Sequence, residues 1–584
     1  MKSASSLAIG SLLAATLALV SCADQTSHGL TGPRADEVLV TTEDAPIDAE
    51  EVVIYPSDGP DGGAVMRTLG IMAVPASRDI RVGVVQSSAA ITLGSGAAYE
   101  IRDKANGLLL LTGPAGTVAT VTLVSAPASF LRLQVMCSTN LTAVAARKTL
   151  AESFGHPTMT QLHPTLGCTR LYVGQLPTTA STTIRNDFKN LLISQGIAQS
   201  DAFYAVVAVA GTSTIYRIVR GATNIQNVNP VVVTATGEIV TIGTTATNGL
   251  TYRGKGEARV TPAGTLAGIN ELPLQQYLYG VVPRELPPTS QWGQPEAQKA
   301  QAVAARTYAM RGYNKRSADG YDLRATTDDQ VYGGYSAEHP VSSAAVDATA
   351  GVVATYQGEL IDALFSSTAG GHTADSEEAF SYSPYLRGVP DRDIDGQWDK
   401  QADKTLEKFL KDDKPKLLLK EQKGDHEIGY SSYYRWSYEW TMEEMSGLIS
   451  ALAGQDVGRV LAINIVERGP SGRALKVDYV TEKAGTVSSG RDGSTRAALK
   501  YRNAAGAIVN LPSTRIFIEP TYEQGLSGPV TGYRVYGAGF GHGVGLSQTG
   551  AAGMAAQGYT YGQILKHYYT GIELTEPTAV ATIP

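Results

Sequence analysis

One stretch of the chain, residues 270–310, places a carboxylic acid among prolines and ahead of two cations. Glu285 lies beside prolines that restrict its backbone, and Lys299 and Arg306 follow it, seven positions apart. Seven residues are two turns of a helix, so the two cations share one helix face. An acid on a constrained loop that faces two cations is a candidate site for proton transfer to a bound ligand. The same residue types are more often solvated surface groups, so the pattern alone leaves both interpretations open.

Prolines interrupt the elements that must position these residues. Pro287, Pro288 and Pro295 forbid one continuous helix across the region. We predict a short helix over Leu274–Tyr279, then a loop that carries Glu285, and then a second helix that begins near Pro295. Four residues fall on one stripe of the second helix and are expected to pack against a neighbouring element: Ala297, Ala300, Ala304 and Tyr308.

Several motifs in this part of the chain resemble the SpoIID/LytB family. LPLQQYLYGVVPREL (272–286) and EAQKAQAVAARTYAM (296–310) look like the signature of that family. Three further matches keep the same order: DDQVYGGY (328–335), LFSSTAGGHT (364–373) and FGHGVGLSQTGAAGMAAQGYTYGQILKHYYTGIEL (540–574). The resemblance implies an α+β fold, with a SpoIID-like mixed α/β catalytic domain over 222–584 and a β-rich N-terminal part.

By this resemblance Glu285 is the catalytic acid of a peptidoglycan lytic transglycosylase. Such an enzyme protonates the oxygen between N-acetylmuramic acid and N-acetylglucosamine. The C6 hydroxyl of the N-acetylmuramic acid then closes a 1,6-anhydro ring. Because no attacking water is needed, the second carboxylate of most glycoside hydrolases is dispensable. The acid must hold a proton at neutral pH, which requires a partly desolvated pocket. Since a contacting cation would oppose this, Lys299 and Arg306 are assigned to sugar hydroxyls, acetamido carbonyls or the lactyl carboxylate.

Other side chains of the matching motifs are candidates for substrate binding: Gln301, Tyr332, Ser366, Ser367, His542 and Gln548. Structural roles stay open for several of them, since Gln301 points away from Lys299 on an ideal helix and a half-buried tyrosine is common in strands. In some family members, His and Cys near the GGHT position look like zinc ligands. No Cys lies in 169–584 here, so we expect no metal and no cofactor.

The N-terminus predicts an address outside the cytoplasm. The apolar run from Leu7 to Val20 is typical of a signal peptide, and the sequence LVSC that ends it resembles the bacterial lipobox. We therefore expect a lipoprotein signal peptide at 1–21, lipidation of Cys22 and a polar tether at 22–36. These features would anchor the chain by lipid to a membrane of the cell envelope, on its periplasmic or extracytoplasmic face. An ordinary signal peptide with an incidental cysteine is the alternative.

Two further segments precede the catalytic region. Residues 37–130 contain short strands broken by turn residues, which indicates a β-rich segment. Residues 131–221 repeat a strand–helix unit, with helices expected at 141–154 and 182–195 and a closing strand at 215–219. This duplicated layout resembles the SPOR domain, which binds glycan strands stripped of their stem peptides.

Two cysteines remain if Cys22 is lipidated. Cys137 and Cys168 both lie in the segment with the duplicated unit. An even pair in an oxidising compartment is a disulfide candidate. Two buried free thiols are the alternative, because spacing alone cannot fix geometry.

The composition excludes one class of partner and leaves three functions. A net charge of −7 without a cluster of Lys and Arg argues against nucleic acid. The leading hypothesis is a lytic transglycosylase that acts on denuded peptidoglycan strands. The second is a non-catalytic peptidoglycan-binding protein that enhances an amidase partner, and the third is a conventional hydrolase. A hydrolase would need a second carboxylate, for which Asp328 and Asp329 are the nearest candidates by motif order.

Overall fold

The structure, a computed structural model, describes residues 78–126, 129–163, 167–178, 180–208, 214–289, 292–391, 425–427, 429–503, 505–524 and 528–575. The predicted signal peptide, Cys22, the tether and the β-rich segment before residue 78 lie outside these residues. Within the described ranges, no helix is long and apolar enough to cross a membrane. Strands and helices occur together along the chain, which confirms the predicted α+β class.

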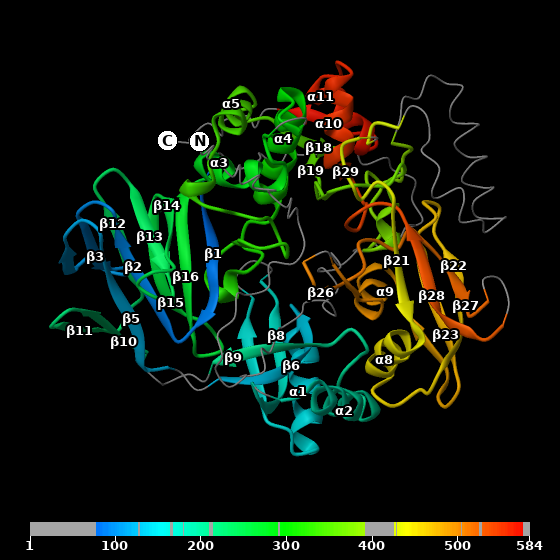
Figure 1. Ribbon diagram of the computed structural model, residues 1–584. Helices are drawn as coiled ribbons and strands as arrows, with labels where there is room; N and C mark the ends of the chain where they lie inside the picture. The colour runs from blue at the N-terminus through cyan, green and yellow to red at the C-terminus, as the bar shows by residue number, and fades with distance from the viewer. Residues whose placement is uncertain are drawn as a thin grey trace, which may run out of the picture.

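Two largely antiparallel sheets form the part drawn at the left of Figure 1. The first, in the order β17-β1-β16-β15-β12-β3-β4, contains β1 (Asp79–Ser88), β3 (Tyr99–Asp103), β4 (Leu109–Gly113), β12 (Val231–Ala235), β15 (Lys255–Val260), β16 (Leu266–Pro273) and β17 (Leu323–Arg324). The second, in the order β11-β10-β5-β2-β13-β14, contains β2 (Ala90–Ser95), β5 (Thr117–Ser125), β10 (Ile215–Arg220), β11 (Thr223–Asn227), β13 (Ile239–Gly243) and β14 (Leu250–Arg253). Alternating apolar residues of both sheets, such as Val82, Val121 and Val233, share one core.

A smaller unit is inserted between β5 and β10, which are neighbours in the second sheet. Its sheet has the order β7-β8-β6-β9 and carries two helices: β6 (Ser129–Ser138), α1 (Leu141–Ser153), β7 (Thr158–Leu162), β8 (Thr169–Pro177), α2 (Thr182–Ser194) and β9 (Phe203–Ala208). The two helices confirm the helices predicted at 141–154 and 182–195. Asn140 and Ser181 cap them, each accepting a hydrogen bond from a backbone N–H of the first turn.

The predicted end of this unit is wrong. The segment at 215–219 was expected to close its sheet, but it forms β10, which pairs with β5 and β11 of the larger sandwich. The closing strand is β9, which pairs with β6. The apolar residues of β10 explain the difference, because Tyr216 and Ile218 are buried in the core of the sandwich. The inserted unit therefore ends near residue 208, and β10 to β16 belong with the β-rich part.

A layer of helices lies above the sandwich in Figure 1. It contains α3 (Leu274–Glu285), α4 (Pro295–Arg311), α5 (Pro340–Ala348), α10 (Gln548–Ala556) and α11 (Tyr561–Tyr568), with the short strands β18 (Val353–Tyr356), β19 (Glu359–Leu360) and β30 (Glu573–Thr575) beside them. The helix predicted from Pro295 is confirmed, with the proline at its first turn. Because α4 contacts α3, α5, α10 and α11, almost its whole surface is buried, including the predicted stripe of Ala297, Ala300, Ala304 and Tyr308.

Helix α3 is longer than predicted. The sequence suggested a helix that ends at Tyr279, yet it continues through Pro283 to Glu285. Pro283 lies in the last turn, where the missing N–H removes one hydrogen bond and leaves little helix beyond it to disrupt. Glu285 is therefore the last residue of a buried helix and does not lie on a loop.

A further unit with its own core, called the second unit below, lies at the right of Figure 1 and spans the described residues of 433–537. Its elements are β21 (Trp436–Thr441), α8 (Met442–Ala453), β22 (Val460–Arg468), β23 (Ala474–Thr481), β24 (Gly485–Ser489), α9 (Asp492–Ala498), β25 (Tyr501–Arg502), β26 (Ile508–Val509), β27 (Ile516–Tyr522) and β28 (Val530–Gly537). After β28 the chain returns to the helical layer, where β29 (Leu546–Ser547) pairs in parallel with β20 (Phe365–Ser366). This pairing brings two of the predicted motifs together.

The structure joins Cys137 and Cys168 in a disulfide, which confirms the predicted pairing. The two cysteines are 31 residues apart and lie on the adjacent strands β6 and β8 or next to them. The bond therefore closes a loop that contains α1 and β7.

We predict that reduction destabilises the inserted unit. A disulfide across 31 residues is expected to contribute about 3–4 kcal/mol to the free energy of unfolding, because it restricts the unfolded chain. Urea unfolding with and without reductant, compared with Cys137→Ser/Cys168→Ser, measures this. Reductant should shift the wild type and the Cys22→Ser control but leave the double variant unchanged. An identical unfolding midpoint in wild type with and without reductant would contradict the prediction.

Candidate functional site

Glu285 is a buried carboxyl group at the C-terminal end of α3. Its side chain is 2% exposed, and its Oε1 accepts a hydrogen bond from the backbone N–H of Val331 at 2.6 Å. Val331 belongs to the DDQVYGGY motif, so this bond joins two motifs that are far apart in the sequence. The helix can approach the second motif closely because Gly280 has no side chain: a Cβ there would lie 2.6 Å from the ring of Tyr332.

Tyr277 and Gln330 link α3, the DDQVYGGY motif and α4 through hydrogen bonds. The Tyr277 hydroxyl donates to Gln330 Oε1 at 3.1 Å, and Gln330 Nε2 donates to the carbonyl of Ala305 on α4 at 3.2 Å. Burial, and then nearby charged groups that include Glu285, raise the pKa of Tyr277 well above its usual range. Tyr277 therefore stays a neutral hydroxyl next to the acid.

Tyr332 packs in the core and does not present its ring to solvent. It is 5% exposed, its ring lies 4.9 Å from that of Tyr277, and its hydroxyl donates to Asn270 Oδ1 at 2.8 Å. These contacts favour the structural role that the sequence left open for Tyr332 over substrate binding.

The two cations of α4, Lys299 and Arg306, have different partners. Lys299 forms an ion pair with Glu296, one turn before it, at 2.7 Å and is partly exposed. Arg306 is 3% exposed and donates to the carbonyls of Val346 and Val352 at 3.2 and 3.0 Å. Burial lowers the pKa of Arg306 to about 10, so it remains charged at neutral pH. The prediction that both cations face a ligand fails for Arg306, because the carbonyl groups at the end of α5 and after it take up its guanidinium.

Gln301 and Gln548 meet in the interior, between α4 and α10. Both side chains are fully buried, and Gln548 Nε2 lies 3.4 Å from Gln301 Oε1. The other two amide atoms, Gln301 Nε2 and Gln548 Oε1, have no hydrogen-bond partner among the described residues. A buried donor and a buried acceptor thus remain available at this junction.

Ser366 and Ser367 lie at the junction of β20 and β29. The Ser366 hydroxyl accepts a hydrogen bond from the N–H of Gly543 at 3.2 Å, and Ser367 Oγ lies 3.4 Å from Thr368 Oγ1. They are 6% and 2% exposed. Their hydroxyls therefore organise the loop that carries them, which is the structural alternative that the sequence left open.

His542 lies on the glycine-rich turn before α10 and is partly exposed. Its Nδ1 accepts a hydrogen bond from Val544 N–H at 3.0 Å, and its ring lies 5.1 Å from that of Phe380. Burial of its ionisable atoms lowers the pKa of His542 to about 4, so it is neutral at neutral pH. Among the described residues, no group of three or more His, Cys, Asp or Glu side chains is arranged to hold a metal ion.

Asp328 and Asp329, the candidates for a second carboxylate, are already engaged. Asp328 forms an ion pair with Arg324 at 2.9 Å and is about half exposed. Asp329 is fully buried and contacts Lys315 at 2.8 Å and Arg316 at 3.2 Å. Burial acts to raise the pKa of Asp329, but these two cations outweigh burial and lower it. Such a carboxylate is held as a structural anion, which disfavours a role in activating water.

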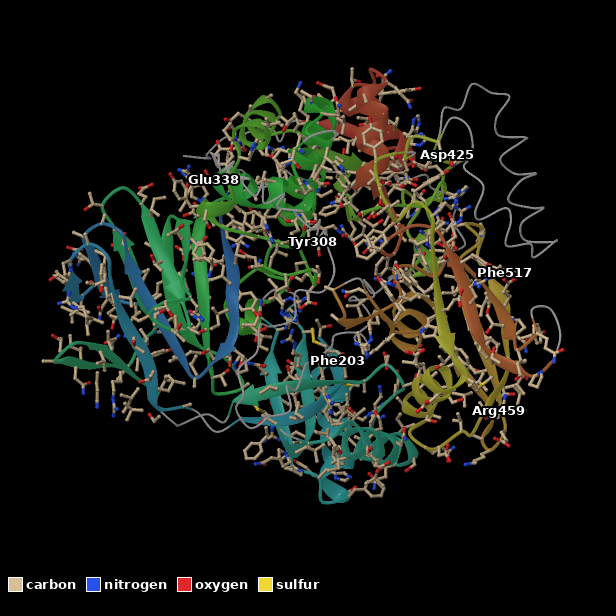
Figure 2. The ribbon with its side chains drawn as sticks, viewed as in Figure 1. Phe203, Tyr308, Glu338, Asp425, Arg459 and Phe517 are labelled. Carbon is tan, nitrogen blue, oxygen red and sulfur yellow. A yellow bond between two sulfur atoms is a disulfide. The ribbon has the colours of Figure 1, made fainter. Side chains whose placement is uncertain are left out.

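Two buried carboxyl groups near α10 were not predicted. Asp391 and Glu427 are both fully buried. Tyr568 of α11 donates a hydrogen bond to Asp391, and Ser547 Oγ donates to Glu427 at 2.5 Å. Burial, and then the charge of Glu427, raise the pKa of Asp391 well above its usual range. In Figure 2 the neighbouring residue Asp425 lies near α10, and the carbonyl of His426 is in close contact with Gly553 of that helix.

The chain is similar to known proteins over the region of these motifs. A family model described as "Stage II sporulation protein" (SpoIID) matches residues 263–356, and one described as a domain of unknown function matches 377–545. The chain is 33% identical over 315 residues to the amidase enhancer of Bacillus subtilis, covering 51% of this chain and 40% of that protein. It thus spans less than half of that relative's length.

Two further relatives match about the same share of the chain. An uncharacterized protein of Brachyspira hyodysenteriae is 30% identical, covering 53% of this chain and 69% of that protein. The stage II sporulation protein D of Bacillus subtilis is 28% identical, covering 53% of this chain and 77% of that protein. Glu285, Lys299, Gln301, Arg306 and Tyr332 all lie in the segment that the family model matches.

We predict that Asp391→Asn reduces the loss of stability at higher pH. The pKa of Asp391 in the folded state lies above its ordinary value of 3.8. The stability that its proton contributes is therefore complete below pH 3.8 and is lost as the pH rises through the raised pKa. Relative to Asp391→Asn, the free energy of unfolding of the wild type should fall by up to about 1.4 kcal/mol per pH unit in that window.

Urea unfolding across the range from acid to neutral pH measures this difference. Asp456→Asn is the control, because Lys483 lowers the pKa of that exposed carboxylate. Parallel stability curves for wild type and Asp391→Asn would contradict the assignment of a proton to Asp391.

Proposed function

We propose, on the premise that this chain belongs to the SpoIID family, that it is a peptidoglycan lytic transglycosylase with Glu285 as its acid and then its base. A role in peptidoglycan processing is the coarser statement that the relatives support. The finer assignment rests on one observation: the signature of the family places a single carboxylic acid, Glu285, in a buried setting next to a second motif of the same family.

The surroundings of Glu285 suit an acid that works without a hydrolytic partner. The nearest carboxylates by motif order, Asp328 and Asp329, are paired with Arg324, Lys315 and Arg316, so neither is available as a second catalytic group. The neutral hydroxyl of Tyr277 adds no charge to this environment. A transglycosylase needs only the one acid, so the absence of an available second carboxylate at this motif does not weigh against it.

The proposed reaction uses Glu285 twice, first as an acid and then as a base. Glu285 donates its proton to the bridging oxygen, and the bond between that oxygen and C1 of N-acetylmuramic acid breaks. The C6 hydroxyl of the same sugar then bonds to C1, and its proton returns to the Glu285 carboxylate. The products are a 1,6-anhydro end and a free hydroxyl on N-acetylglucosamine, so no water is consumed and the acid is regenerated.

The second candidate function is a peptidoglycan-binding protein that enhances an amidase. The printed name of one relative, the amidase enhancer, supports it. The structure adds one specific observation: Glu285 is 2% exposed and the hydroxyls of Ser366 and Ser367 are buried, so a glycan reaches these groups only if neighbouring side chains move. A protein of this kind would bind glycan and stimulate its amidase partner without cleaving the strand.

The inserted unit and the N-terminus complete the proposal. Residues 129–208 would bind denuded glycan as a SPOR-like module and raise the local concentration of substrate at the helical layer. Lipidation of Cys22 would hold the chain at a membrane of the cell envelope, where peptidoglycan is within reach.

We predict that Glu285→Gln abolishes product release and leaves folding intact. Glutamine keeps the shape and an acceptor for the Val331 N–H but cannot deliver a proton, so the rate should fall by at least about 10²-fold. Amidase-treated glycan strands are incubated with wild type, Glu285→Gln and the control Asp328→Asn, and products are identified by mass spectrometry. The control should retain activity, since Asp328 is partly exposed.

Two outcomes would decide against the enzyme. Equal product release from wild type and Glu285→Gln would remove Glu285 from the chemistry. If neither chain releases product, yet both pellet with glycan and stimulate a peptidoglycan amidase, the second candidate function holds.

A further inference from the structure

The loop at residues 369–371 has an unusual set of hydrogen bonds, because side chains satisfy its backbone. The N–H groups of Ala369, Gly370 and Gly371 all donate to the carboxylate of Glu427, at 2.5, 2.7 and 2.8 Å. Three successive N–H groups that converge on one point form a concave anion site. Here the anion is a side chain from a distant part of the sequence.

This conformation requires glycine. Gly370 and Gly371 have φ angles of +79° and +96°, which side chains disfavour. A Cβ on Gly371 would also lie 2.8 Å from Asp425 Oδ2, and one on Gly370 would lie 2.7 Å from the backbone of Ala538. The two glycines of the GGHT motif therefore turn the loop around Glu427.

The carbonyl groups of the same loop are held by cations of the second unit. Arg473 donates to Ala369 O at 3.1 Å, and Arg435 donates to Gly370 O at 3.1 Å. Arg515 donates to Gly370 O as well. Burial, followed by the charges of the other two arginines, lowers the pKa of Arg515 to about 9, so it remains a cation at neutral pH. The loop thus lies between one carboxylate and three guanidinium groups.

Glu427 also holds the start of α10. It accepts hydrogen bonds from Ser547 Oγ at 2.5 Å and Thr549 Oγ1 at 3.2 Å, in the first turn of that helix. A carboxylate is favoured there by the N-terminal end of the helix dipole. Gln548 lies between these two residues and contacts Gln301 of α4. From α4, Gln298 donates to the carbonyl of Leu286, the residue after Glu285, at 2.9 Å.

We propose that Glu427 is a positioning residue of the transglycosylase site: it fixes the 369–371 loop and the first turn of α10, and through Gln548 and α4 it fixes the end of α3 that carries Glu285. This inference rests on the proposed function and deepens it. It also assigns a role to the segment that matches a domain of unknown function, since Glu427, Arg435, Arg473 and Arg515 all lie in it. That segment would complete the site from outside the SpoIID match.

Charged groups of both signs lie near Glu427. Besides burial, the charge of Glu427 contributes to the raised pKa of Asp391 and also acts on the guanidinium of Arg473. Asp425 accepts a hydrogen bond from the Tyr434 hydroxyl and lies beside Gly371. The donors that surround Glu427 are those that a carboxylate accepts and a neutral amide cannot match.

Glu427→Gln tests the inference in the full chain, with Glu378→Gln as the matched control. Glu378 is equally buried in the same segment and accepts hydrogen bonds from Ser471 N–H and Oγ, but it does not contact the 369–371 loop. Glu427→Gln should lower kcat on denuded glycan by about 10²-fold, the effect of misplacing reacting groups by about 1 Å. Amide exchange of Ala369, Gly370 and Gly371 should accelerate in Glu427→Gln and stay unchanged in the control.

The exchange measurement separates this inference from the proposed function. If the wild type cleaves no glycan, loss of amide protection in Glu427→Gln would still show that Glu427 fixes the 369–371 loop. Only the proposed transglycosylase activity would then be wrong. Unchanged kcat and unchanged protection in Glu427→Gln would overturn the inference. If Glu427→Gln does not fold, Thr549→Val removes one donor to the same carboxylate and should lower kcat by about 10-fold, the effect expected for loss of one hydrogen bond to a carboxylate. Wild-type kcat and protection in that variant would overturn the inference equally.

Discussion

The arrangement of the motifs depends on satisfying the backbone of residues 369–371 in the interior. Gly370 and Gly371 adopt left-handed conformations, so their N–H groups cannot join a strand ladder. Buried N–H groups must still be paired, and Glu427 provides the acceptor. A buried carboxylate in turn needs several donors, which the first turn of α10 supplies. The carbonyl groups of the loop also need donors, and they accept hydrogen bonds from arginines of the second unit.

These linked requirements explain why the chain returns to the helical layer after β28. The strand pair β20–β29 brings the SSTAGG and GLSQTG segments together, and α10 then packs against α4. Helix α4 is buried on almost every side and contacts α3, whose last residue is Glu285. The position of Glu285 therefore depends on how several motifs pack against one another. Family signatures that are dispersed in the sequence meet for this reason.

Local patterns predicted the elements that local chemistry controls. The proline at the start of α4 and the two helices α1 and α2 lie where the sequence placed them. Long-range choices were harder to predict. The residues of β10 do not show by themselves that this strand pairs with the sandwich. The sequence around Arg306 likewise does not show that its guanidinium donates to carbonyl groups of α5 and the segment after it. Glu427 and Asp391 follow no periodic pattern, and their role appears only when the loop folds around them.

In the proposed mechanism, a single acid, Glu285, closes an anhydro ring without water. The most direct measurement is the mass of the new muramic acid ends that the wild-type chain forms from denuded glycan in water enriched with heavy oxygen. The proposed mechanism should give ends that are one water lighter than a hydrolytic product and carry no heavy oxygen. New ends that contain a full water with heavy oxygen would contradict it, because they would require a hydrolase with a second catalytic group.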